Sequence, residues 1–232
     1  MQPAAIPLDP TLLSPQILHI KKKLLARTIG QDHAVDKLCG ILETYFAGYN
    51  DPRKPVGIVL ELGPTGTGKT TLIENLCDIL YGDPLAHVRV NCADFGDEYQ
   101  TNRLVGAPPG YVGYKDKKHD SYFSQEALDK HHTPDLKLTI VLLDEIEKAN
   151  LTFYRYLLAI FNDGRGRVDG EMVDFTRVLF VMTSNLGATD MGRSIGSSAK
   201  DLVPPSCRTK NSSRARDPAI RGQLAAALSP AR

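Results

Sequence analysis

One stretch of the sequence has the residue types and the spacing of a phosphate-binding loop. Residues 63–71 read GPTGTGKTT, which contains the pattern G-x-x-x-x-G-K-[ST]. In such a loop, glycines allow the backbone N–H groups to converge on phosphate oxygens. Lys69 would contact the β- and γ-phosphates, and the Thr70 hydroxyl would bind Mg²⁺. The predicted nucleotide-binding residues are Gly63, Pro64, Thr65, Gly66, Thr67, Gly68, Lys69, Thr70 and Thr71.

The flanks of this loop support the prediction. An apolar run at 56–62 predicts a buried strand, and LIENLCDIL at 72–80 predicts a helix that begins near Lys69. The positive end of the helix dipole would then face the phosphates. A Gly-rich turn with no ligand is the alternative, and a strand and a helix on the two sides favour the phosphate-binding loop.

Two consecutive acids, Asp144 and Glu145, follow the apolar run Ile140–Leu143. The carboxyl ends of parallel strands face the ligand crevice in an α/β sheet. Asp144 would hold Mg²⁺ there, and Glu145 would orient or deprotonate a water molecule. Alternatively, the two acids begin a helix, where the dipole favours negative charge. The upstream phosphate-binding loop favours the catalytic interpretation.

A third polar group is expected at the end of the next strand, which is followed by Asn185. Its side chain would lie beside the γ-phosphate and position the attacking water, although an Asn in a strand-to-loop turn is also common. The sequence has no Asn-Lys-x-Asp stretch for reading guanine. We therefore expect ATP, with Mg²⁺, as the bound nucleotide.

The remaining pattern predicts an α/β fold with strands and helices in alternation. Apolar residues at helical spacing predict helices over 16–26, 32–46 and 151–163, the last closed by Gly164. Further strands are predicted at 86–92, 137–145 and 177–185. Strands separated by helices imply a parallel sheet with helices on both faces, which is the three-layer sandwich of P-loop NTPases.

Composition excludes several classes of partner. The 232 residues have a net charge of +1, so no general attraction to nucleic acid or to an anionic membrane is expected. The longest apolar runs are far too short to span a bilayer, and no secretory signal is visible. Four scattered cysteines are typical of reduced thiols, and we expect a cytoplasmic protein.

Several segments outside the loop and the acid pair resemble one family in their order and spacing. They are RTIGQDHAV, GAPPGYVGY at 106–114, VLLDEIEKAN, NDGRGRVDGEMVDF and MTSNLGA. The chain resembles the C-terminal ATPase domain of the ClpA/ClpB unfoldases, which are AAA+ ATPases. The resemblance covers roughly residues 27–191 and implies ATP hydrolysis by a chaperone that unfolds or disaggregates polypeptides. A P-loop kinase would leave GAPPGYVGY without an explanation.

The resemblance also implies roles for matching positions. Ile29 and Gly30 would line the adenine pocket, Asp144 and Glu145 match the Walker B acids, and Asn185 matches the sensor residue. Further residues match the loop that grips polypeptide in the central pore of a hexamer. These are Gly110, Tyr111, Val112 and Gly113. A tyrosine between glycines is an aromatic group on a mobile backbone, which suits contact with many side chains.

We divide the chain into an extended leader at 1–16, the AAA+ ATPase core at 17–193, and a Ser/Pro/Arg-rich tail at 194–232 with a short helix over 218–228. By resemblance, an arginine finger, a last strand and a helical lid would come after position 232, and we expect them to be missing. Without that last strand, the strand at 56–62 would be an exposed apolar edge of the sheet. Two hypotheses follow. The chain is an ATPase subunit of a homo- or hetero-hexameric ring completed by a partner, or it is an ATP-binding remnant or adaptor with little hydrolysis.

Overall fold

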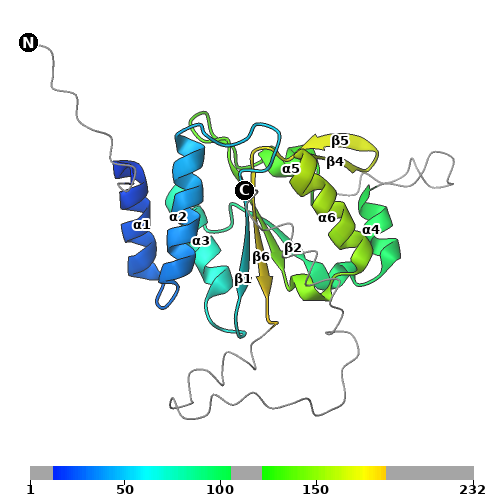
Figure 1. The fold of residues 1–232 in the computed structure, drawn as a ribbon, viewed down its shortest axis with the longest axis horizontal. Helices are drawn as coiled ribbons and strands as arrows, with labels where there is room; N and C mark the ends of the chain where they lie inside the picture. The colour runs from blue at the N-terminus through cyan, green and yellow to red at the C-terminus, as the bar shows by residue number, and fades with distance from the viewer. Residues whose placement is uncertain (1–12, 106–121, 187–232) are drawn as a thin grey trace, which may run out of the picture.

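The centre of the protein is a sheet of four parallel strands with helices on both faces (Figure 1). The structure is a computed structural model that describes residues 13–105 and 122–186. The spatial order of the strands is β1-β6-β3-β2. Their bounds are β1 Gly57–Leu62, β2 Val88–Asn91, β3 Thr139–Asp144 and β6 Val178–Ser184. The predicted α/β class and the three layers are confirmed.

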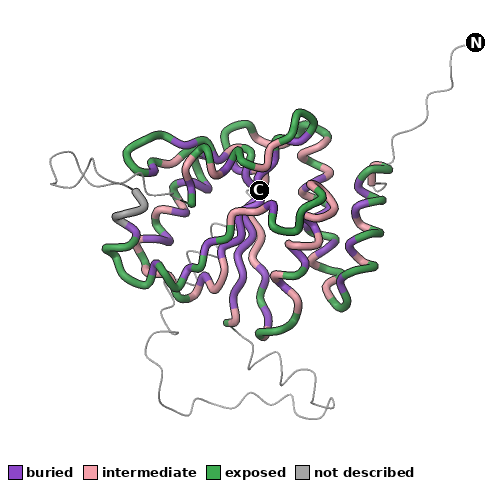
Figure 2. Tube along the Cα trace, turned by 180° about the vertical axis from the view of Figure 1, so that it is seen from behind, coloured by how far each residue is buried: buried purple, intermediate pink, exposed green. Residues whose placement is uncertain are grey.

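Three helices, α1 (Pro15–Arg27), α2 (Asp32–Phe46) and α3 (Lys69–Tyr81), form one outer layer. The opposite layer contains α4 (Glu98–Val105), α5 (Gln125–Asp129) and α6 (Leu151–Asp163) (Figure 1). The two central strands β3 and β6 are buried along their whole length except at Asp144, as the purple strands of Figure 2 show.

Alternation along the central strands divides the core between the two layers. Leu142 and Val181 pack with α1, α2 and α3, whereas Leu143 and Phe180 pack with α5 and α6. Successive side chains of a strand point to opposite faces, so one apolar run supplies both cores. This double burial fixes the central strands and with them the position of the residues at their carboxyl ends.

The strand predicted at 56–62 is present but is not buried; it lies at an edge of the described sheet, as expected from the resemblance when the family's last strand does not pair with it. Among the described residues β1 pairs only with β6, so it forms an edge of the sheet. Its residues are mostly half-buried, and Glu61 is the buried exception. The second paired neighbour that protects a central strand is lacking among these residues, which explains the difference.

Local capping residues mark several ends of the predicted helices, and the predicted helix starts are correct to within one residue. Asn150 caps α6 by accepting a hydrogen bond from the Phe153 N–H at 2.9 Å, and Gly164 ends this helix with φ +62°. Helix α1 begins at Pro15 after the cap Ser14, one residue earlier than predicted and inside the expected leader. Helices α2 and α3 also begin where predicted.

Shorter elements were not predicted. They are the helices α4 and α5, the 3-10 turns η1 (Cys92–Phe95) and η2 (Ile146–Lys148), and a hairpin of β4 (Arg165–Val168) and β5 (Glu171–Asp174). The hairpin turns at Asp169 and Gly170, both with positive φ. An Asp-Gly pair between two short strand segments is a common signal for such a turn, so the hairpin could have been predicted from the sequence.

Some predicted segments lie outside the described residues. These are the leader up to residue 12, the predicted pore loop at 110–113, and everything beyond residue 186, including the predicted helix over 218–228. Within the described part of the chain, no helix is both long and apolar enough to cross a membrane. Cys39, Cys77 and Cys92 are buried free thiols there.

Candidate functional site

The predicted phosphate-binding loop connects β1 to α3, as the sequence indicated. Gly68 immediately precedes α3 with φ +86°, and Gly66 has φ +82°. Both values lie in the left-handed region that side chains disfavour, so these two positions require glycine. The Thr67 hydroxyl donates to Pro64 O at 2.9 Å and closes the loop internally. Helix α3 therefore begins with its N-terminus at the loop, where an anion is stabilised.

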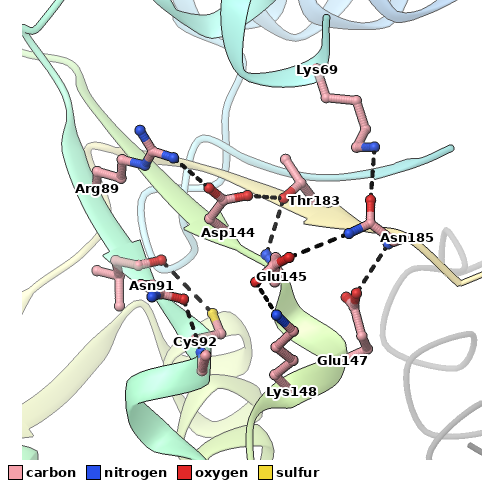
Figure 3. A network of polar contacts seen from close by, with 12 residues as sticks. Lys69, Arg89, Asn91, Cys92, Asp144, Glu145, Glu147, Lys148, Thr183 and Asn185 are labelled. Atoms are coloured by element: carbon pink, nitrogen blue, oxygen red, sulfur yellow. Dashed lines mark hydrogen bonds and ion pairs between the residues drawn. The ribbon is translucent and has the colours of Figure 1, made fainter. Parts of the chain in front are cut away.

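Lys69 lies across this loop and is only 8% exposed. Its ammonium donates to the backbone oxygens of Gly63 at 2.7 Å and Pro64 at 2.9 Å. It also donates to Asn185 Oδ1 at 3.2 Å. Figure 3 shows the lysine reaching the asparagine at the end of β6. Two residues predicted separately from the sequence, Lys69 and Asn185, are thus in contact.

The carboxylate of Asp144 lies at the carboxyl end of β3 and is held by two neighbouring strands. Its Oδ1 accepts a hydrogen bond from Thr183 Oγ1 at 2.6 Å, and its Oδ2 forms an ion pair with Arg89 Nη2 at 2.7 Å. Burial raises the pKa of Asp144, but the bonds from Thr183 and Arg89 and the charges of Arg89 and Lys69 outweigh it. The net pKa is lowered, so Asp144 is ionised at neutral pH.

Glu145 has an unusual backbone for a residue with a side chain, with φ +55°. Its N–H donates to Thr183 Oγ1 at 3.1 Å. Its carboxylate forms an ion pair with Lys148 and lies 3.5 Å from Asn185 Nδ2 (Figure 3). A left-handed non-glycine residue is uncommon and tends to occur at functional sites. The alternative, that the two acids begin a regular helix, does not hold, because a 3-10 turn follows them.

Beside the loop lies a cavity of about 520 Å³, between the start of α2 and the edge strand β1. Gly30 and Gln31 line it, and so does Lys69. Ile29, predicted together with Gly30, is 95% exposed and does not line the cavity. The Gln31 side chain donates to Thr67 O at 2.9 Å and so joins this segment to the phosphate-binding loop.

The cavity contains one buried acid that was not predicted. Glu61 is 7% exposed, and among the described residues neither of its carboxylate oxygens has a hydrogen-bond partner. Burial raises its pKa to about 7, although the positive charge of Lys69 opposes this. A charged residue inside the otherwise apolar run of β1 was the signal that could have identified it.

Besides Gln31, the sequence reasoning missed side chains that contact the predicted acids and Asn185. They are Arg89, Lys148, Thr183 and Glu147, whose carboxylate accepts the Asn185 N–H at 3.2 Å. Thr183 lies in β6, two residues before Asn185, which directly follows the strand. That spacing was a usable signal. Arg89 lies on β2, and its contact with Asp144 depends on how the strands are ordered. Lys148 lies only three residues after Glu145, at the end of η2, so its contact is local.

A parallel α/β sheet with a phosphate-binding loop after its first strand, and with acids at the end of β3, defines the class of P-loop nucleotide-binding proteins. The model of the AAA domain (Cdc48 subfamily) matches residues 54–231, and the chain belongs to this family. The resemblance stated from the sequence is thereby confirmed.

Individual relatives agree with this family. The chain is 34% identical to the negative regulator of genetic competence ClpC/MecB of Bacillus subtilis (strain 168), over 93% of this chain and 25% of that protein. It is 39% identical to the chaperone protein ClpB of Vibrio cholerae serotype O1 (strain ATCC 39315 / El Tor Inaba N16961), over 75% of this chain and 19% of that protein. The chain therefore spans about a fifth to a quarter of these relatives.

One solved structure has a similar fold. It is described as the closed-state cryo-EM reconstruction of Hsp104 with ATPγS and FITC casein, and it superposes with a TM-score of 0.67 at 28% sequence identity. The match covers 81% of this chain and 31% of the Hsp104 chain. The fold found here is thus the fold of a part of that larger protein.

Proposed function

We propose that this chain binds MgATP at residues 63–71 and hydrolyses it. The observation that carries the proposal is the contact cluster at the carboxyl ends of β3 and β6. Lys69 from the loop touches Asn185, and Asn185 lies against Glu145, which directly follows Asp144. Groups for binding phosphate, holding metal and activating water are therefore gathered at one edge of the sheet.

The oxygen donors of this site suit Mg²⁺. The ion prefers oxygen ligands and is usually bound by one or two protein groups together with phosphates and waters. The Thr70 hydroxyl in the first turn of α3 and the ionised Asp144 are the proposed protein donors. Among residues 13–105 and 122–186 no three His, Cys, Asp or Glu side chains form a separate metal cluster. When bound, Mg²⁺ neutralises charge that develops on the phosphate oxygens.

The residues of the chain divide the remaining work. Lys69 supplies a positive charge to the phosphates, and Glu145 accepts a proton from the attacking water. Asn185, within contact of both, orients that water. The adenine base is assigned to the side of Gly30, which lines the cavity beside the loop.

We further propose that hydrolysis drives the remodelling of polypeptides in a hexameric ring, in the cytoplasm. The support is the membership of the family and the similarity to ClpB, a chaperone, and to Hsp104, whose structure was determined with casein. The loop with Gly110, Tyr111, Val112 and Gly113, which lies outside the described residues, would contact the substrate.

The binding step is tested with Lys69→Ala and the surface control Lys54→Ala. Titration of a fluorescent ATP analogue should show affinity reduced by about tenfold or more for Lys69→Ala, because a charge-assisted contact to phosphate is lost. Lys54 is exposed in the turn before β1, so its replacement should leave the affinity unchanged. Equal affinities for the two variants would remove the assignment of the loop. Binding without measurable ATPase activity in the wild type would favour an ATP-binding adaptor.

A further inference from the structure

Thr183 is a buried residue of β6 that touches both acids of the proposed catalytic pair. It is 2% exposed. Its hydroxyl donates to Asp144 Oδ1 at 2.6 Å and accepts the N–H of Glu145 at 3.1 Å. A hydroxyl has one proton to donate and two lone pairs to accept with. One oxygen atom thus binds the side chain of one acid and the backbone of the next (Figure 3).

The bond to Glu145 supports a backbone conformation that is otherwise unfavourable. Glu145 has φ +55°, a value that a residue with a side chain adopts only when its surroundings hold it. Its N–H donates a hydrogen bond to the Thr183 hydroxyl in place of a backbone carbonyl of a helix. Without this acceptor, a half-buried N–H group would lose its partner, and other conformations of the turn would compete.

The bond to Asp144 orients a carboxylate that accepts hydrogen bonds from two side chains. Thr183 contacts one carboxylate oxygen and Arg89 contacts the other, from opposite neighbouring strands. Arg89 is more than half exposed, whereas Thr183 is buried in the sheet. The buried bond is the more rigid of the two, because its donor has a single staggered torsion and is packed on all sides.

We propose that Thr183 is the positioning residue of this site, which sets Asp144 for metal and Glu145 for water. The inference rests on the proposed function, since it assigns no separate activity. It differs from a packing role in one respect: the hydroxyl is required and the methyl group is not. Outer groups that orient ligands of a metal commonly change affinity or activity by about 10–100-fold when removed.

Three variants separate the hydroxyl from the shape of the side chain. Thr183→Val keeps the shape and removes the hydroxyl, whereas Thr183→Ser keeps the hydroxyl and removes the methyl group. Thr139→Val is the matched control. Thr139 is also buried, begins β3 at the opposite end from Asp144, and donates to Leu128 O at 2.6 Å. This control therefore removes a buried, hydrogen-bonded hydroxyl from the same sheet at a distance from the site.

The readouts are ATP hydrolysis and binding of a fluorescent ATP analogue, each measured against Mg²⁺ concentration. We expect kcat of Thr183→Val to fall about 10–100-fold and its half-saturating Mg²⁺ concentration to rise several-fold. Analogue binding in EDTA should stay within about twofold of wild type, because Lys69 and the loop are unchanged. Thr183→Ser should recover most of the activity, and Thr139→Val should behave like wild type in every assay.

A second background shows whether Thr183 acts through Glu145. In a Glu145→Gln protein at saturating Mg²⁺, the residual kcat should not fall further when Thr183→Val is added, because residues that act as a unit are not additive. The effect on Mg²⁺ requirement should persist there, since it acts through Asp144. Should Thr183→Val not fold, as judged by thermal unfolding, Thr183→Ala removes the same hydroxyl without adding bulk and takes its place.

Several results would overturn the inference. Wild-type hydrolysis and Mg²⁺ dependence in Thr183→Val would do so, as would an equal loss in Thr139→Val or no recovery in Thr183→Ser. An additive loss in the Glu145→Gln background would show a general structural effect. If the wild-type chain binds no nucleotide, the proposed function itself is wrong and this inference falls with it. If the wild type binds nucleotide but does not hydrolyse it, the Mg²⁺ dependence of analogue binding in Thr183→Val still tests the inference, and a wild-type dependence would overturn it.

Discussion

Lys69 Nζ donates to Asn185 Oδ1 at 3.2 Å, although 116 positions separate the two residues in the chain. The lysine belongs to the first turn of α3 and the asparagine follows β6. The contact exists because β6 lies directly beside β1, whose carboxyl end continues into the phosphate-binding loop. The order of the strands therefore decides which polar side chain accompanies the bound phosphates.

This contact leads to a prediction for Asn185→Ala. Hydrolysis should fall about 10–100-fold, because an oriented side chain beside the attacking water is lost. Affinity for ATP should change by only a few-fold, since Lys69 retains its bonds to Gly63 and Pro64. Steady-state ATPase rates and analogue titration measure the two effects. Asn162→Ala, on the exposed side of α6, is the control and should match wild type. Loss of affinity as large as the loss of rate would contradict the proposed role.

Glu61 leads to a prediction about stability and pH. Its carboxyl is buried and its pKa is raised to about 7, so the folded protein binds a proton that the unfolded chain releases above about pH 4.5. The contribution of Glu61 to the free energy of unfolding is therefore lost as the pH rises from about 4.5 to about 7. The loss amounts to at most about 3 kcal/mol.

Glu61→Gln should remove this part of the pH dependence. In urea unfolding at pH 5 and pH 7.5, the variant should gain stability relative to wild type at the higher pH, because a neutral amide replaces a buried charge. Glu126→Gln, an exposed position on α5, should show no such difference. If the stability difference between Glu61→Gln and wild type is the same at both values, Glu61 does not titrate in this range.

Tyr111 allows a test of the proposed ring. We predict that Tyr111→Ala separates ATP hydrolysis from the unfolding of a tagged fluorescent substrate, while Tyr111→Phe retains both. An aromatic face grips many side chains, and its hydroxyl is not needed for this contact. Both activities should be followed in parallel in an assembled or mixed ring. Loss of nucleotide binding in Tyr111→Ala would make Tyr111 a core residue, and unchanged unfolding would mean that the substrate is gripped elsewhere.

Much of the fold was predictable because its signals are local. The apolar runs of β3 and β6, and the glycine-lysine pattern before α3, depend only on neighbours in the sequence. The edge position of β1 could not be predicted from its own residues, since an apolar run is similar in a central and in an edge strand; only the resemblance led us to expect it. The small hairpin after α6 was missed although its Asp-Gly turn was visible.

Within the candidate site, too, some residues could be predicted from local patterns and others could not. Asp144, Glu145 and Asn185 were predicted as site residues from the sequence, because each follows an apolar run. Thr183 and Arg89 were not, because their partner in contact, Asp144, lies 39 and 55 positions away in the chain. The positive φ of Glu145 was also beyond the sequence, since glutamate has no preference for that region.

We propose that this site hydrolyses ATP and that Glu145 activates the attacking water. Wild type and Glu145→Gln should be compared in two assays on the same preparations, binding of MgATP and single-turnover hydrolysis. We expect the two proteins to bind MgATP with equal affinity within a few-fold, and hydrolysis by Glu145→Gln to be reduced by about 10²-fold or more, because the amide cannot accept the proton. Hydrolysis by Glu145→Gln at the wild-type rate would show that Glu145 does not activate water and is only a residue of the turn after β3.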